Sequence, residues 1–196
     1  MAIDDVRIIS NRSTGALGHK IAQYLIKEKA KVTVLEGPVT DRLTIKPSRV
    51  IKFQFFDEFA QILQKELKKK YNIVVHAAAV SDYRLTNNFA SKLSSEFSCV
   101  KLNLVPTVKL IDRIKRISPK SILVGFKLES GVDKELLLVK AHNLMKKARC
   151  DFVVANTVSD KKFNGYILDQ KRRILSQTAT RDEIAKNLVS ILKARI

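Results

Sequence analysis

Several short segments of the sequence hold residue types that suit the binding of an anionic ligand. The first supplies Asn11, Ser13, Thr14 and Gly15 immediately before an apolar pattern of helical period. Free backbone N–H groups at the start of a helix attract phosphate, and a glycine lets the ligand approach the backbone. Asn11 adds an amide donor and acceptor. The same residues also suit an ordinary helix cap, in which Ser13 or Thr14 satisfies the first turn.

The second segment, from His76 to Arg84, follows a continuous apolar run. Ala78 and Ala79 leave room for a ligand against the backbone, and Asp82 follows where a strand would end. Ligands of open parallel sheets bind beyond the carboxyl ends of the strands. The alternative is close packing of a strand against a helix, with Asp82 capping a turn.

Three further segments add a cation, an aromatic ring and an amide. Lys92 lies in a long polar stretch over 81–99, where a loop lysine can stabilise developing negative charge; a solvated lysine is the alternative. Phe126 ends an apolar run over 121–126 and suits either a nucleotide base or the core. Asn156 places an amide at the end of the next apolar run.

Helices and strands must position these segments, and the apolar residues alternate along the sequence between helical and strand periods. Helices are predicted over 16–30, 57–70, 108–117, 133–147 and from Thr180 onward, and strands over 31–35, 73–77, 100–105, 121–126 and 151–155. Residues 166–168 and 173–175 resemble a hairpin. The alternation predicts an α/β, Rossmann-like fold with a mostly parallel sheet and helices on both faces, plus that small hairpin. The length favours one domain over 1–196.

The composition indicates which classes of binding partner the protein is expected to have. A net charge of +18 favours small anionic substrates or nucleic acid, but no aromatic-rich binding motif accompanies the basic residues. We therefore expect a lysine-rich solvated surface and no nucleic-acid partner. The two cysteines form no ligand cluster, so no metal site is predicted. No apolar run approaches the roughly 20 residues of a membrane span, so we expect a cytoplasmic protein without a membrane partner.

Taken in series, these segments resemble the phosphopantothenate–cysteine ligase (phosphopantothenoylcysteine synthetase) family. Residues 6–18 are similar to its "VR-ISN-SSG-MG" stretch, and 77–84 to its "AAAVSDY" stretch. Residues 92–95 resemble its mobile-loop lysine motif in the form found in stand-alone ligases. The stretches 104–106, 124–129 and 153–156 also fit. The resemblance covers nearly the whole chain and includes no flavin-dependent decarboxylase module.

The resemblance implies a homodimer and a two-step reaction. The carboxylate of 4′-phosphopantothenate would attack the α-phosphate of CTP or ATP with Mg²⁺, and the amine of cysteine would then displace the nucleotide. The matched positions imply roles for individual residues. Asn11 would bind the acyl-phosphate intermediate, Lys92 would close over the site, Ala79 and Asp82 would contact substrate or nucleotide, Phe126 would border the nucleotide, and Lys147 would reach its phosphates.

One departure from the family pattern concerns its beginning. The family starts with a strand and a Gly-Gly-Thr phosphate loop, whereas almost nothing precedes Ile3 here. We therefore expect a shortened ligase with an opening in the sheet and weak triphosphate binding.

Two other functions compete with the ligase. A short-chain NAD(P)-dependent reductase would need a Tyr-x-x-x-Lys pair, and none of Tyr24, Tyr71, Tyr83 or Tyr166 has a lysine four positions on. A basic nucleic-acid-binding module would show steeply salt-dependent binding.

Overall fold

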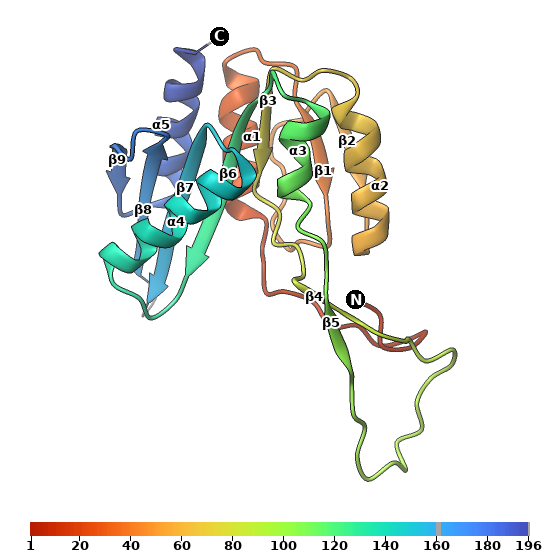
Figure 1. Cartoon of the computed structure of the whole chain (residues 1–196). Coiled ribbons are helices and arrows are strands. Elements are labelled where there is room, and N and C mark those ends of the chain that lie inside the picture. Colours follow the sequence, from red (N-terminus) through yellow and green to blue (C-terminus); the bar gives the residue numbers. More distant parts are fainter. Residues whose placement is uncertain (160–161, 196) are drawn as a thin grey trace.

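The computed structural model describes residues 1–159 and 162–195 and has the predicted α/β architecture (Figure 1). The helices are α1 (Ala16–Lys27), α2 (Phe56–Leu67), α3 (Ile111–Ile117), α4 (Lys134–Ala148) and α5 (Arg181–Lys193). The strands are β1 (Thr33–Glu36), β2 (Arg49–Lys52), β3 (Ile73–His76), β4 (Tyr83–Leu85), β5 (Leu104–Pro106), β6 (Ile122–Glu129), β7 (Phe152–Ser159), β8 (Lys162–Asp169) and β9 (Ile174–Thr178).

The strands of the main body form two sheets. In one, β1 pairs with β2 in parallel; in the other, the order is β3-β6-β7-β8-β9. The pairs β3–β6 and β6–β7 are parallel, whereas β8 and β9 add an antiparallel edge. The predicted C-terminal hairpin is confirmed as part of this edge. Among the described residues, no helix has the length and apolar content to cross a membrane.

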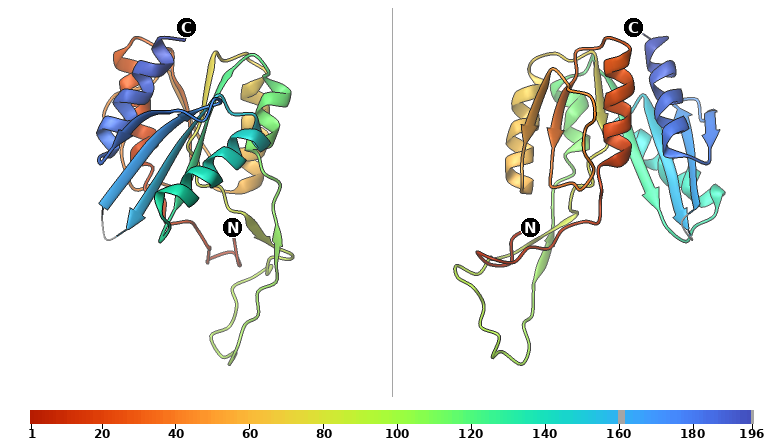
Figure 2. Two further views of the ribbon diagram at one scale, coloured as in Figure 1. Left: turned by 60° about the vertical axis from the view of Figure 1, so that its left-hand side comes forward. Right: turned by 180° about the vertical axis from the view of Figure 1, so that it is seen from behind.

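Helices cover both faces of the strands, as predicted. On one face, α1 and α5 lie side by side (Figure 2) and are joined by ion pairs from Lys20 to Asp182 at 2.9 Å and from Lys193 to Glu28 at 2.6 Å. The predicted capping box begins α5, because the hydroxyl of Thr180 accepts a hydrogen bond from the backbone N–H of Glu183.

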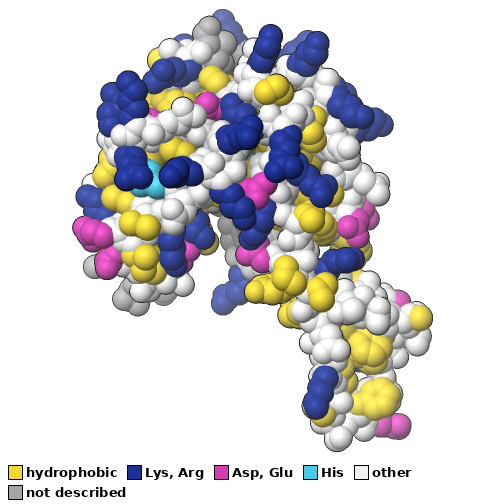
Figure 3. Space-filling model, viewed as in Figure 1, with side chains coloured by type: hydrophobic (Ala, Val, Ile, Leu, Met, Phe, Trp, Pro, Cys, Tyr) yellow, Lys and Arg dark blue, Asp and Glu magenta, His cyan; other side chains and the backbone are white. Residues whose placement is uncertain are grey.

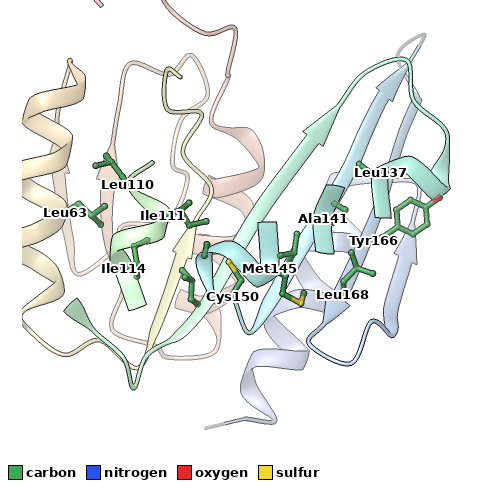
Figure 4. Close-up of a cluster of buried hydrophobic side chains, with 14 of the residues drawn as sticks. Leu63, Leu110, Ile111, Ile114, Leu137, Ala141, Met145, Cys150, Tyr166 and Leu168 are labelled. Atoms are coloured by element: carbon green, nitrogen blue, oxygen red, sulfur yellow. The ribbon is translucent and has the colours of Figure 1, made fainter. Parts of the chain in front are cut away.

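The opposite face is covered by α2, α3 and α4. Leu137, Ala141 and Met145 recur along α4 at helical spacing and lie over Tyr166 and Leu168 of β8 (Figure 4). Leu137 and Leu168 have no exposed surface. Full burial of such a side chain contributes roughly 1.5–3 kcal/mol, so this layer fixes α4 against the sheet.

An opening in the strand pairing separates β1 from β3; the shortened ligase expected from the family pattern stays a prediction. The two strands belong to different sheets, yet both lie between α1 and α2. Ile73 of β3 packs in the core layer of α1, and Leu35 of β1 packs in the layer of α2. The Tyr71 hydroxyl also donates to Thr33 Oγ1 at 3.1 Å. The neighbouring helices therefore hold the two strands in one arrangement, although the strands are not paired with each other.

An arm built from β4, β5 and the loop between them extends from the body (Figure 1). The sequence placed one loop over 81–99, but β4 lies inside it and pairs antiparallel with β5. The expected strand over 100–105 forms only at Leu104–Pro106. Asp4 joins the arm to the first residues of the chain, because its carboxylate accepts the backbone N–H groups of Val6, Arg7 and Leu93.

The opening leads to a test by strand addition. An N-terminal extension of five β-branched residues followed by Gly-Gly-Thr should pair with the free edges of β1 and β3. We expect the melting temperature to rise by about 2–4 °C, because a gain of about 1 kcal/mol in the free energy of unfolding moves it by that much in a domain of this size. Thermal unfolding followed by circular dichroism measures the change. An extension of equal length made of Gly and Ser is the control, and equal melting of the two proteins would show that the opening accepts no strand.

Candidate functional site

A cavity of about 600 Å³ lies at the carboxyl ends of β3 and β6. Its walls come from the segment that follows β3, the start of α3, the end of β6 and one face of α4. This position follows from the topology, because parallel strands deliver the residues after their carboxyl ends to a single edge of the sheet.

The cavity brings together five of the predicted binding residues. Its lining includes Ala78, Ala79, Asp82, Phe126 and Lys147. The Asn11 side chain reaches the same wall, because its Nδ2 donates a hydrogen bond to the carbonyl oxygen of Ala79 at 2.8 Å. An amide NH₂ group has two donors, so this contact leaves Asn11 a second N–H group.

The start of α1 adjoins Asn11 and contains the other predicted phosphate-binding residues. Gly15 is the N-cap and has a φ of 81°, in the left-handed region. A Cβ at Gly15 would lie 2.8 Å from Cγ1 of Val39, so only glycine fits this close approach. The Thr14 hydroxyl accepts from the N–H of Ala16 at 3.3 Å, a local capping contact. Ser13 is exposed beside it.

Two predicted residues lie elsewhere. Lys92 is exposed in the arm and does not line the cavity. The adjacent Leu93 is fixed to the N-terminal segment through Asp4 and through Arg7, whose Nη2 donates to the Leu93 carbonyl at 3.0 Å. Asn156 is buried within β7, opposite Leu128, and also lies outside the cavity lining.

Four lysines surround the cavity, each paired with a carboxylate. Lys127 and Lys140 both contact Glu129 at 2.8 Å, and Lys147 lies 3.6 Å from Asp112. The fourth, Lys109, pairs with Asp82. The hydrogen bonds from Lys127 and Lys140 hold the pKa of Glu129 below its usual value. The four ammonium groups exceed the three carboxylates by one.

Lys109, Lys127 and Lys140 were not predicted as site residues. The position of Lys127 could have predicted it as a site residue, because it directly follows Phe126 at the end of an apolar strand. Lys140 could have been predicted too, because a spacing of seven residues places it on one face of a helix with Lys147. Lys109 reaches the site only through the fold, which brings the start of α3 beside Asp82.

His76 ends β3 and lines the cavity, but its Nε2 is sealed from solvent and has no hydrogen-bond partner. Its ring centroid lies 6.1 Å from that of Phe59 on α2. This burial lowers the pKa of His76 to about 4, because the charged imidazolium would lose its hydration. His76 is therefore neutral at physiological pH.

These features define a class of protein: an α/β fold with a basic cavity beyond parallel strand ends, beside a glycine-started helix, which suits an organic phosphate. A family model described as the DNA/pantothenate metabolism flavoprotein C-terminal domain matches residues 1–195. The chain belongs to that family, and the resemblance found in its sequence is confirmed.

Similar proteins include enzymes named for coenzyme A biosynthesis. The bifunctional protein CoaBC of Thermococcus kodakarensis is 39% identical over 157 residues, covering 80% of this chain and 38% of that protein. The CoaBC protein of Borreliella burgdorferi is 31% identical over 198 residues, covering 97% of this chain and 49% of that protein. The chain thus spans about half or less of the length of these relatives.

Solved structures share the fold. The DNA/pantothenate metabolism flavoprotein from Streptococcus pneumoniae matches with a TM-score of 0.89 and 25% identity, covering 100% of this chain and 94% of that one. A Cab2 variant in complex with phosphopantothenate-cysteine matches with a TM-score of 0.78 at 18% identity, covering 100% of this chain and 82% of that one. At that identity the second match supports the fold alone.

The buried His76 makes stability sensitive to acid. Its folded pKa of about 4 lies below the ordinary value of 6.5, so between these values the unfolded chain binds more protons and stability falls as pH falls. From pH 7.5 to pH 5 the loss from this group amounts to about 2 kcal/mol.

Urea unfolding at pH 7.5 and pH 5 measures this loss. In His76→Gln the free energy of unfolding should fall by about 2 kcal/mol less over that interval than in the unchanged protein. The same fall in both proteins would mean that His76 is not the acid-sensitive group.

Proposed function

We propose that this chain joins cysteine to 4′-phosphopantothenate, with CTP or ATP as activator, in coenzyme A biosynthesis. The observation that carries the proposal is that Ala79, Asp82, Phe126 and Lys147, assigned from the family pattern, meet in one cavity. Membership of the family supports it, as do the names of the CoaBC relatives. The Cab2 complex adds a protein of the same fold bound to phosphopantothenate-cysteine.

The first step activates a poor electrophile. An oxygen of the phosphopantothenate carboxylate attacks the α-phosphorus of the triphosphate, and the bond to the β-phosphate oxygen breaks to release pyrophosphate. The ammonium groups of Lys109, Lys127, Lys140 and Lys147 neutralise charge on the phosphates. Fixed charges of this kind stabilise a transition state without reorganisation during the reaction.

The second step forms the amide. The cysteine nitrogen attacks the acyl carbon, the acyl–oxygen bond breaks, nucleoside monophosphate leaves, and the amine loses a proton to solvent. In this proposal the second N–H of Asn11 donates to the acyl phosphate, while Ala79 fixes the amide through the first. The start of α1, including Ser13 to Gly15, holds a phosphate, and Phe126 borders the nucleotide.

The carboxylates of the cavity do not fit a separate Mg²⁺ site. Asp82, Asp112 and Glu129 are each paired with lysine, and the described residues include no group of three possible metal ligands. The proposal therefore assigns Mg²⁺ to the triphosphate, since this ion keeps several waters and commonly binds substrate phosphates. No step above depends on its position.

We assign the arm two roles: Lys92 acts at the cavity, and the apolar surface of the arm contacts a second copy of the chain. For Lys92 to act, the arm must move over a cavity, either of its own chain or of a second copy. Apolar side chains are exposed along the arm and the adjoining first residues (Figure 3), among them Val6 at 65%, Tyr83 at 52% and Phe97 at 60%. Exposed apolar area of this kind marks contact surfaces, and we propose that it joins two copies in a homodimer.

A pyrophosphate assay tests the reaction directly. With phosphopantothenate, Mg²⁺ and CTP or ATP, but no cysteine, we expect one equivalent of pyrophosphate per active site and then arrest. Added cysteine should restore continuous release and produce nucleoside monophosphate in equal amount. The absence of phosphopantothenate-dependent release with both nucleotides would overturn the function.

The same assay tests the arm. Lys92→Gln should lower turnover by about 10²–10³, the usual cost of losing a charge-stabilising donor, and should leave the melting temperature unchanged because Lys92 is exposed. Lys101→Gln is the matched control, since Lys101 is an exposed lysine of the same arm. Equal activity of the two variants would remove Lys92 from the mechanism.

A further inference from the structure

A second cavity, of about 1030 Å³, lies at the carboxyl ends of β1 and β2. Its lining comes mainly from the loop over residues 37–48, and the rest comes from Glu36 and from residues between Val50 and Glu58. Sites for small organic ligands typically have volumes of about 300–1,000 Å³, so this cavity has the size of such a site. It shares no lining residue with the first cavity.

The segment over residues 11–15 connects the two cavities. On one side, Asn11 bonds to Ala79 in the wall of the first. On the other, the carbonyl oxygen of Thr14 accepts from the N–H of Asp41 at 3.0 Å, and Gly15 approaches Val39. Asp41 and Val39 both line the second cavity. A ligand there would therefore lie beside the same helix start that faces the first.

The acidic side chains of the second cavity all have polar partners. Glu36 and Asp41 lie 3.2 and 3.0 Å from the two ring nitrogens of the buried His19. Glu58 accepts from the backbone N–H groups of Gln54 at 2.7 Å and of the N-cap residue Phe55 at 3.4 Å, and so caps the start of α2. The three acidic groups in the lining are thus occupied.

The basic residues of this cavity have no such partners. Arg42, Lys46 and Lys52 line it, and none of them makes an ion pair within residues 1–159 and 162–195. The lining thus has three acidic and three basic side chains, but His19 and backbone N–H groups hold the carboxylates, whereas the three cations make no ion pair in the described part of the chain and can contact one bound anion.

The remaining wall is apolar. Val39, Leu43, Ile45, Val50 and Phe53 contribute to it. An inorganic anion would leave this surface in water, whereas an organic molecule with a charged end would cover it. The combination matches a phosphate ester with an extended body.

We propose that the second cavity binds an organic phosphate, with Arg42, Lys46 and Lys52 around the phosphate and the apolar wall against the organic part. This site is separate from the cavity assigned above to the nucleotide-dependent reaction. Binding at this site does not depend on that reaction, because the two cavities share no lining residue.

Isothermal titration calorimetry of the full chain tests the site, with 4′-phosphopantothenate and AMP as probes of the two kinds of organic phosphate. Pantothenate and adenosine are the controls that lack the phosphate, and inorganic phosphate is the control that lacks the organic part. At least one complete phosphate ester should bind more tightly than both of its parts. Binding of neither ester, or binding of inorganic phosphate with equal affinity, would overturn the proposal.

Variants then locate the bound ester. Lys46→Gln combined with Lys52→Gln should weaken binding by about fivefold to tenfold, as expected for two exposed charge contacts. Lys65→Gln with Lys186→Gln is the control pair, since both lysines are exposed and lie outside both cavities. The proposed function also puts both esters in the first cavity, so Lys127→Gln should leave unchanged only the part of the binding that depends on Lys46 and Lys52. Binding that is weakened by Lys127→Gln but not by the Lys46/Lys52 pair would place the ester in the first cavity alone and overturn the proposal.

These measurements contain neither cysteine nor a nucleoside triphosphate. The variants separate the two proposals, because unchanged binding in the Lys46/Lys52 pair counts against the second cavity alone, whereas absent pyrophosphate release counts against the ligation alone.

Discussion

The pairing of lysines with carboxylates at the carboxyl edge of the parallel strands is the interaction on which the candidate site depends. The fold delivers four lysines to one cavity, and like charges that lie close together repel one another. Asp82, Asp112 and Glu129 remove most of that repulsion.

The same pairing leaves the lysines available to a ligand. Their side chains are between 34% and 68% exposed, and pairs of this kind contribute only about 0.2–1 kcal/mol. A phosphate that enters the cavity can therefore replace a carboxylate partner at small cost. The apolar layers behind it, with Leu137 and Leu168 fully buried, keep the strand ends fixed while the side chains exchange partners. Stability and binding thus reside in different parts of the chain.

Much of the fold could be predicted because its central strands are apolar and continuous. The run that became β3 is one example, and the capping box at Thr180 is another. The strand β2 was missed because Arg49 and Lys52 flank only two apolar residues, Val50 and Ile51, and its pairing with β1 is a tertiary contact. Ala79, Asp82 and Phe126, expected from segments next to strand ends, all line the cavity, and their binding roles stay predictions. Lys92 and Asn156 lie outside the cavity. The spacing of residues along a sequence does not predict the direction in which the arm with Lys92 extends, nor the face of the sheet on which the amide of Asn156 lies.

The lysine cluster is tested most directly by the binding of inorganic triphosphate to the chain, measured by calorimetry in low salt. This anion has no organic body to cover the apolar wall of the second cavity, and it should bind among the four lysines of the first. We expect this binding to weaken by about tenfold when Lys127→Gln and Lys140→Gln are combined, and to be unaffected by the control pair Lys65→Gln and Lys186→Gln. Equal affinity of the unchanged protein and the Lys127/Lys140 variant would contradict a phosphate-binding role of the cluster, because the anion would then be held by the second cavity or by the general surface charge.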